Sequence, residues 1–218
     1  DTSTLTITLS EANSLFTNAD VTCDNGDVGA LSVSGNVYTG TFTPTAEVED
    51  DSNTCVVGTD WTDTAGNTGT AFTSGNYEID GIDPTVTSVG ISDASIISGE
   101  TATVTIVLSE TNSGFTNDDV TCASGSVGTL SVSGNTYTGT FTPTTNTEAG
   151  TNTCVVGTSW TDTAGNAPLA GLTSSAYAVD SLVPTSVVTS ISDTSLIEGD
   201  TAVITITLSE ANSGFTND

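Results

Sequence analysis

Short stretches of this chain alternate apolar and polar residues with a period of two. In TATVTIVLS (residues 101–109) the alanine, valine, isoleucine and leucine share one face, and threonines dominate the other. TYTGTFTPT (residues 136–144) repeats the alternation with aromatic residues. This period, in segments rich in Thr, Val and Tyr, is typical of half-buried β-strands. Turn signals such as SGN and AGN separate the stretches and no capped helical stretch is visible, so the pattern predicts an all-β chain.

The same sequence blocks recur along the chain, separated by the length of about one domain. WTDTAGN occurs at residues 61–67 and again at 160–166, and equivalent leucines stand at positions 9, 108 and 208. A step of about 100 residues is the size of a domain and too long for a solenoid repeat. We therefore expect tandem domains: residues 1–83 form a repeat that lacks its first strand, residues 84–183 a complete repeat, and residues 184–218 the start of a third.

The two ends of the chain overlap in sequence, which leaves two interpretations. Residues 184–200 of one chain could supply the strand missing from residues 1–83 of another. Residues 201–218 would then duplicate strands that the first repeat already has. A segment cut from a longer array explains the overlap better, and the lack of a signal peptide or initial Met also suggests a mature or excised segment.

The complete repeat contains seven stretches with strand character. They lie near residues 85–91, 101–109, 119–123, 128–132, 136–142, 153–159 and 175–180. Seven short alternating strands in about 100 residues favour an immunoglobulin-like β-sandwich with Greek-key connections. The third and sixth strands would then be neighbours in one sheet.

The four cysteines form two pairs with the same spacing. They are Cys23 with Cys55, and Cys122 with Cys154. With no His in the chain, most zinc sites and a Cys–His nucleophile are disfavoured. Equal pairs favour one disulfide in each repeat and an oxidising, extracellular setting, with free buried thiols as the alternative. The bridge would join the third and sixth strands, unlike the usual bridge between the second and sixth.

The charge of the chain is entirely of one sign. There are 27 acidic residues and no Lys, Arg or His, which gives a formal net charge of −27. Nucleic-acid binding depends on Lys and Arg that neutralise phosphates, and anionic membranes attract basic segments, so neither partner is supported. No apolar run approaches the ~18 residues of a membrane span. The hydrophobic content of 35% is nevertheless enough for a core, so disorder is not expected.

Four blocks, taken in order, carry a family resemblance. They are residues 98–121, YTGTFTPT (137–144), WTDTAGN (160–166) and YAVDSLVPT (177–185). Together they resemble the bacterial Ig-like repeats of large surface adhesins, the RTX-type and biofilm-associated extender domains. The resemblance recurs in every repeat and implies a tandem array that projects an adhesive tip from the cell and is often stiffened by calcium. The cysteine pair and the lack of basic residues depart from that family.

Acidic side chains gather where an immunoglobulin-like topology brings loops together. The loops after the second and sixth strands lie at the end where the linker from the preceding repeat arrives. Carboxylates do not cluster without a counterion, and Ca²⁺ takes six to eight oxygens from Asp, Glu, Asn and carbonyl groups. The sequence therefore predicts a calcium site at this joint. The candidate ligands are Asp80, Asp83, Glu110, Asp119, Asp162 and Asn166, with Glu11, Asp20, Asp63 and Asp180 at equivalent positions of other repeats.

Each candidate ligand also has a purely structural explanation. Asp162 in DTAGN suits an Asx turn with Gly165 in the left-handed conformation, and Glu110 suits a solvated surface. The acidic run AEVEDDSN (residues 46–53) is read as a loop of the preceding repeat, and such runs are usually solvated. The two tryptophans are expected to pack in the core or against loops.

Four classes of function remain to be compared. The favoured one is a structural spacer in a secreted or cell-surface array, in contact with neighbouring repeats of its own chain. The alternative is a subunit of a self-assembling extracellular filament or sheath made of identical chains, because no lysine guards the strand edges. An enzyme is disfavoured, since without His, Lys or Arg only paired carboxylates could perform acid–base chemistry. Carbohydrate binding is disfavoured because aromatic residues are few and mostly at inward positions.

Overall fold

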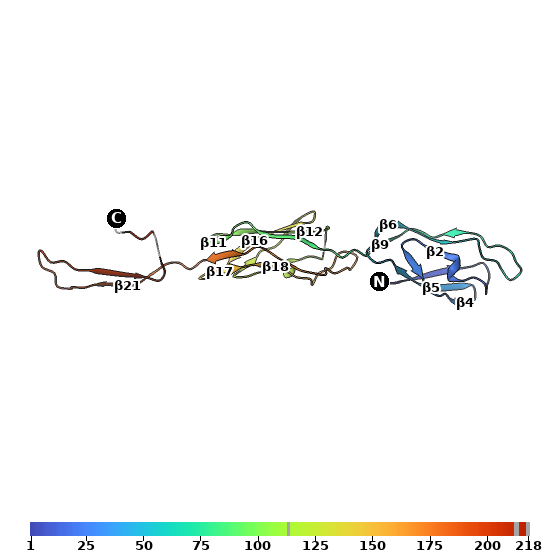
Figure 1. Cartoon of the computed structure of the whole chain (residues 1–218), viewed down its shortest axis with the longest axis horizontal. Helices are drawn as coiled ribbons and strands as arrows, with labels where there is room; N and C mark the ends of the chain where they lie inside the picture. Colours follow the sequence, from blue (N-terminus) through green and yellow to red (C-terminus); the bar gives the residue numbers. More distant parts are fainter. Residues whose placement is uncertain (113, 212–213, 217–218) are drawn as a thin grey trace. The chain divides into compact units, whose positions relative to one another are not determined.

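The structure is a computed structural model that describes residues 1–112, 114–211 and 214–216. Contacts divide the chain into two compact units. The first contains Asp1–Thr85 together with Asn112–Phe115 and Thr158–Leu169, and the second contains Val86–Thr111, Thr116–Gly157 and Ala170–Asp218. Throughout the described residues the regular elements are β-strands and two single-turn 3-10 helices (Figure 1).

The first unit is built from antiparallel sheets. In one sheet, β5 (Val37–Pro44) pairs with β1, β3 and β4 (Ser3–Thr8, Gly26–Val28 and Ser32–Ser34). A second sheet has the order β2–β7–β8 (Val21–Cys23, Cys55–Val57 and Phe72–Thr73). The last pair joins β6 (Glu49–Asn53) to β9 (Tyr77–Asp80). A 3-10 turn, η1 (Asn18–Asp20), leads into β2.

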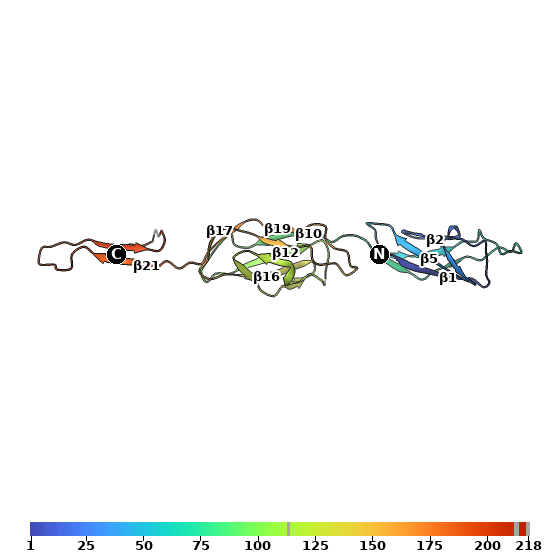
Figure 2. The same cartoon turned by 90° about the horizontal axis from the view of Figure 1, so that it is seen from below.

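The second unit repeats this arrangement and adds two strands at its start. Its first sheet has the order β10–β12–β16–β14 (Val86–Ile91, Ala102–Leu108, Thr136–Pro143 and Gly125–Val127), with β15 (Ser131–Ser133) also on β16. Strands β12 and β16 run side by side in both views (Figure 2). The other sheets are β13–β18–β19 (Val120–Cys122, Cys154–Val156 and Leu172–Thr173) and β11–β20–β17 (Ser95–Ile97, Tyr177–Asp180 and Glu148–Asn152). The turn η2 (Asn117–Asp119) precedes β13.

The alternating apolar residues of each repeat form the core between the sheets. Along β12, every second side chain from Ala102 to Leu108 is buried. Across the layers, Phe141 of β16 packs edge-to-face on Tyr177 of β20, with 5.3 Å between the ring centres. Phe42 and Tyr77 make the same contact in the first unit at 5.2 Å. Aromatic pairs in this geometry contribute about 0.5–1.5 kcal/mol beyond their area burial.

The expected all-β, immunoglobulin-like sandwich is confirmed, but several strands differ from the prediction. The structure adds β11, β14, β17 and β19, which the alternation did not indicate. The strand expected near residues 128–132 is displaced, since β15 begins at Ser131. The interpretation of AEVEDDSN as a loop was wrong, because Glu49–Asn53 form β6 and pair with β9. The missed segments become strands because they pair with the edge of a neighbouring strand, although apolar and polar residues do not alternate in their own sequences.

Both expected disulfides are present. Cys23 bonds to Cys55 and Cys122 to Cys154, and no free cysteine remains in the described residues. Each pair stands directly opposite across neighbouring strands, in β2–β7 and β13–β18. The bridges therefore tie the third and sixth expected strands within one sheet. Closing a loop of this length stabilises a fold by about 3–4 kcal/mol in the chain-entropy account.

The C-terminal part is a single hairpin. β21 (Ser186–Ile191) pairs with β22 (Ile204–Leu208), and both strands have mostly exposed side chains. Nowhere in the described residues is there a helix with the length and apolar character needed to cross a membrane.

Candidate metal centre

The loop WTDTAGN of the second repeat is organised around the Asp162 carboxylate. Its Oδ1 accepts hydrogen bonds from the backbone N–H groups of Ala164, Gly165 and Asn166 at 2.9, 2.7 and 2.9 Å. Its Oδ2 accepts from Asn166 Nδ2 at 2.9 Å. Gly165 has a φ of 105°, which favours glycine, and this explains the AGN sequence of the turn.

These hydrogen bonds set the protonation state of Asp162, which is buried. Only 5% of Asp162 is exposed. Burial raises the pKa of Asp162, but hydrogen bonds from Asn166, Gly165 and Ala164 together outweigh it and hold the pKa below its ordinary value. The carboxylate is thus kept ionised at neutral pH, which a cation ligand requires.

Buried asparagines hold this loop in place. Asn112 Nδ2 donates to the Thr161 carbonyl at 2.9 Å, while its Oδ1 accepts from the backbone of Gly114 and Phe115. Asn13 makes the equivalent contact to the Thr62 carbonyl, also at 2.9 Å. Sequence reasoning missed these residues, although the repeated NS-F motif (residues 13–16 and 112–115) was visible as their signal.

Asn166 joins the loop to the end of β9. Its Nδ2 donates to the Asp80 carbonyl at 3.1 Å and approaches Asp80 Oδ1 at 3.3 Å, in addition to its bond with Asp162. Asp80 Oδ1 also accepts from the Ile82 backbone N–H at 3.3 Å. Residues 80 and 166, distant in sequence, therefore meet, as the sequence predicted.

Three of the predicted ligands form a compact acidic group. Asp80, Glu110 and Asp162 each place a carboxylate oxygen within 4.8 Å of the other two. Among the described residues this is the one group of three or more acidic, histidine or cysteine side chains gathered so closely. Asn166, which bonds both aspartates, borders the group and is a fourth candidate ligand through its amide oxygen.

Other predicted ligands have structural roles. Asp119 Oδ2 accepts from the backbone N–H and hydroxyl of Thr116 and closes a capping box on η2. Asp20 makes the same box with Thr17 on η1. Both acids lie outside the group of three. Their position three residues after a threonine was a capping signal in the sequence.

In the first repeat, Asp63 forms the same turn as Asp162. It accepts from the backbone of Ala65 and Asn67 and from Asn67 Nδ2 at 2.7–2.8 Å. The hydrogen bond from the Asn67 side chain is the largest cause of the lowered pKa of Asp63. Unlike Asp162, Asp63 belongs to no acidic group of three among the described residues. The turn is therefore common to both repeats, and the acidic group is a separate feature.

The remaining predicted ligands lie near strand ends. Glu11 is exposed after β1, and Asp83 lies between β9 and β10. Asp180 ends β20 and is one repeat step beyond Asp80. It lines a cavity of about 370 Å³ together with Glu210, which is equivalent to Glu110. Glu210 Oε1 is the one buried side-chain oxygen or nitrogen in the described residues that lacks a hydrogen-bond partner.

A comparison with protein families identifies the repeats. The family model for the bacterial Ig-like domain matches residues 1–79 and residues 80–179, which together are most of the chain. The chain belongs to the bacterial Ig-like domain family. Asp80, the last residue of β9, lies where the two matches meet, and Glu110 and Asp162 lie within the second match. The chain is thus a tandem array of structural repeats, in which each repeat has another as its neighbour.

Comparison with individual proteins adds a solved structure. No curated protein matches the Ig-like chain. A crystal structure of the I9–I11 tandem of titin is similar over 83% of this chain, with 10% sequence identity and a TM-score of 0.30. The match spans 60% of that titin chain.

Proposed function

We propose that the chain is part of a structural spacer in an extracellular, cell-surface adhesin, and that calcium stiffens the connection between its repeats. The observation that carries the proposal is the acidic group of Asp80, Glu110 and Asp162. It involves the end of one repeat's last strand and two loops of the repeat that follows in sequence. A cation held by these residues would fix the linker on which the array bends.

The donor set fits calcium in its chemistry and dimensions. Ca²⁺ binds oxygens at about 2.4 Å, so two oxygens on the same ion are at most about 4.8 Å apart. The three carboxylates meet that limit without rearrangement. Asn166 donates its side-chain amide to the Asp80 carbonyl and to both aspartate carboxylates, and its amide oxygen would add a further donor of the hard-oxygen kind that this ion prefers. No thiolate or imidazole is available for a softer metal, because the cysteines are bridged and the chain has no histidine.

The electrostatics of the chain also favour a cation. Three carboxylates so close together repel one another, and no Lys, Arg or His exists in the chain to balance them. The Debye length of about 8 Å at 0.15 M salt leaves charges at this separation largely unscreened. Extracellular calcium modules bind with a Kd of about 10⁻⁴–10⁻³ M, which suits the fluid outside a cell.

A second acidic pair supports the proposal that the site recurs in the next repeat. Asp180 and Glu210 repeat the positions of Asp80 and Glu110 and line one cavity. The unpartnered Glu210 Oε1 is a buried acceptor with no donor to satisfy it. Such an oxygen is costly to bury unless a hydrogen bond or cation meets it. A cation between Asp180 and Glu210 would supply that partner.

Titration calorimetry with matched variants tests the site. The wild-type chain should bind calcium at submillimolar to millimolar concentration, and Glu110→Gln should weaken that binding at least tenfold. Glu11→Gln changes the equivalent exposed residue of the first repeat, removes the same charge, and should leave binding unchanged. Equal binding by all three proteins, or no heat with the wild type, would exclude this site.

A second candidate is a subunit of a self-assembling filament or sheath. The observation in its favour is that the chain has no lysine to guard the edges of its strands against pairing with another chain. Negative-stain images separate the candidates. Single threads are expected of the spacer, whereas bundles or tubes of regular width would support the filament.

A further inference from the structure

The sheets of the second repeat end in strands that have a neighbour on one side only. The outer side of such a strand presents backbone N–H and C=O groups that can pair with a strand of another chain. Natural sheets often place lysine at these edges, and this chain has none. At two of the edges, side chains from nearby residues occupy the outward backbone groups instead.

The first of these edges is β11, which pairs only with β20. Ala178 of β20 stands opposite Ser95, and its N–H donates to the carbonyl of Ala94, the residue before Ser95, at 2.9 Å. In a parallel ladder this places the N–H groups of Ser95 and Ile97 on the side away from β20. These two N–H groups are the donors that an added strand would use.

Carboxylates occupy both of these outward donors. The Ser95 N–H donates to Asp93 Oδ1 at 2.9 Å, and the Ile97 N–H donates to Glu100 Oε2 at 3.0 Å. Each acid lies in the turn next to β11, so the chain caps its own strand with residues two or three positions away. An N–H that already has an acceptor offers little to a strand from another molecule.

The same caps recur in the next repeat. Asp193 Oδ1 accepts from the Ser195 N–H at 2.8 Å, and Asp200 Oδ2 accepts from the Ile197 N–H at 3.0 Å. Position 200 has Asp where position 100 has Glu. What recurs is therefore a carboxylate on the same backbone N–H, although the residue that supplies it differs.

The second capped edge is formed by β14 and β15, which both pair with β16. Asn117 of η2 donates through Nδ2 to the carbonyls of Val127 and Gly128 at 3.2 and 2.7 Å. Its Oδ1 accepts the Leu130 N–H at 2.9 Å. The Gly128 N–H donates to Thr140 of β16, so the carbonyl of the preceding Val127 points away from the sheet. The amide thus takes the place of a strand and divides the edge into two pieces of three residues each.

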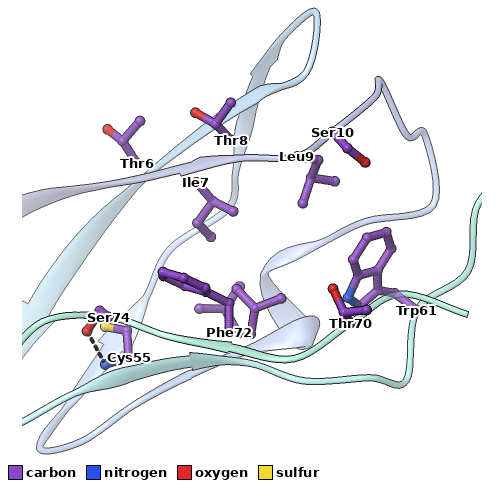
Figure 3. A pocket seen from close by; sticks show the side chains of 12 residues that line it. Thr6, Ile7, Thr8, Leu9, Ser10, Cys55, Trp61, Thr70, Phe72 and Ser74 are labelled. Carbon is purple, nitrogen blue, oxygen red and sulfur yellow. Dashed lines mark hydrogen bonds between the residues drawn. The ribbon is translucent and has the colours of Figure 1, made fainter.

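A side chain also replaces a backbone partner where β8 ends in the first repeat. Ser74 follows β8, and its Oγ accepts the Cys55 N–H at 2.9 Å (Figure 3). Ser174 makes the same contact with Cys154 in the second repeat, also at 2.9 Å. Short polar side chains therefore satisfy backbone groups at several places in this fold.

The remaining edges of the second repeat are protected in other ways. A bulge interrupts the pairing of β10 with β12 and of β17 with β20. β13 and β19 are only three and two residues long. Bulges and short edge strands both hinder the addition of a strand from another chain.

We propose that Asp93, Glu100 and Asn117 are edge caps, which keep copies of this chain from pairing through the sheets of the second repeat. They act by hydrogen bonding to the outward backbone groups of β11 and of the β14–β15 edge. The lack of lysine therefore does not leave these two edges open. Loss of a cap leaves a backbone group without its partner, and a strand of a second copy can then satisfy it.

Sedimentation of the full chain in chelator tests the β11 caps without any contribution of calcium. The wild type should remain monomeric as its concentration rises. Asp93→Ala combined with Glu100→Ala should associate, with a several-fold larger fraction of oligomer than the wild type at the same concentration. Asp93→Asn combined with Glu100→Gln removes the same charges but keeps an oxygen for each N–H, so this protein should remain monomeric.

Asn117→Ala tests the second edge, and Asn135→Ala is its matched control. Asn135 Nδ2 donates to the Leu108 carbonyl at 2.7 Å. Leu108 ends β12, which lies between β10 and β16, so the control loses a side-chain hydrogen bond without opening an edge. Asn117→Ala should associate and Asn135→Ala should remain monomeric, with circular dichroism to compare the folding of the two variants.

Hydrogen exchange locates the contact. In dilute Asp93→Ala Glu100→Ala protein, the N–H groups of Ser95 and Ile97 should exchange faster than in the wild type, because they have lost their acceptors. At concentrations where the variant associates, their exchange should slow again, since a strand of a second copy then accepts them. Faster exchange throughout the repeat at both concentrations would instead show general destabilisation and would count against the caps.

Alanine variants that remain monomeric, or a wild type that associates as strongly as they do, would overturn the proposal. Equal association of the Asn/Gln variant or of Asn135→Ala would also overturn it, because charge or stability would then control association. None of these results depends on the calcium site, because all are measured in chelator.

Discussion

Replacement of Asp80 by asparagine removes one charge from the acidic group and keeps an oxygen in nearly the same place. The amide oxygen of the new side chain can still accept the Ile82 N–H and lie beside Asn166, as the carboxylate does in the wild type. The substitution therefore tests the negative charge of Asp80 separately from its hydrogen bonds. In chelator it should stabilise the protein, and in calcium it should remove a ligand, so its effect should depend on the ion.

The size of the effect follows from the spacing of the charges. Two unit charges about 4.8 Å apart repel by about 0.9 kcal/mol in water and about 3.5 kcal/mol at an effective dielectric constant of about 20. Asp80 faces Glu110 and Asp162, so two such repulsions are removed. For groups near solvent, the repulsion energy is closer to the lower of these two values. We expect Asp80→Asn to raise the free energy of unfolding in chelator by about 1–2 kcal/mol, or about 4 °C or more in Tm for a domain of this size.

Calorimetric melting with and without calcium measures both halves of the prediction. At calcium ten times above Kd the wild type should gain about 1.4 kcal/mol per site, and the advantage of the variant should shrink by about that amount. Asp83→Asn is the control, since it removes a charge from the same linker outside the group of three. If Asp80→Asn destabilises the chain in chelator, or responds to calcium as the wild type does, the electrostatic reasoning is refuted.

Three further predictions concern the stability that the disulfides, Asn112 and Asp63 give to the repeats. Reduction of the two disulfides should lower the free energy of unfolding by about 3–4 kcal/mol for each repeat, and non-reducing peptide mapping should show each bridge within its own repeat. Asn112→Ala should cost about 1–3 kcal/mol, because Thr161 and two N–H groups lose a buried partner, and urea unfolding measures this. The hydrogen bonds of Asn67 lower the pKa of Asp63, so the stability they give is full above the unfolded pKa of about 3.9 and is lost as pH falls through the lower folded value. Melting of Asp63→Asn against pH should therefore show a shallower loss of stability in acid than the wild type.

The sequence predicted strands well where a side-chain pattern marks them. β12 and β16 alternate clearly because one face is buried and the other is in water. β17 and β19 were missed for a physical reason. Glu148–Asn152 is polar and lies on an edge, and Leu172–Thr173 is too short for any period. Their strand character comes from partners that are remote in sequence.

The candidate site was predicted in part. Asp80, Glu110 and Asp162 were placed together because the topology of the repeat brings strand ends and loops to one end. Asp119 was assigned the same role from its charge, although its spacing from Thr116 already matched a capping box. The supporting role of Asn112 was missed because a buried amide and an exposed amide look the same in a sequence, and only the repeated NS-F motif marked this residue.

Small-angle X-ray scattering of the chain in calcium and in chelator tests the central claim most directly. If calcium stiffens the connection between repeats, the maximum dimension should be longer and the distribution of distances sharper with calcium than with chelator. Asp162→Ala should remove most of that difference, while Asp63→Ala, which disrupts the same turn in the first repeat, should preserve it. Identical scattering from the wild type with calcium and with chelator would contradict the account.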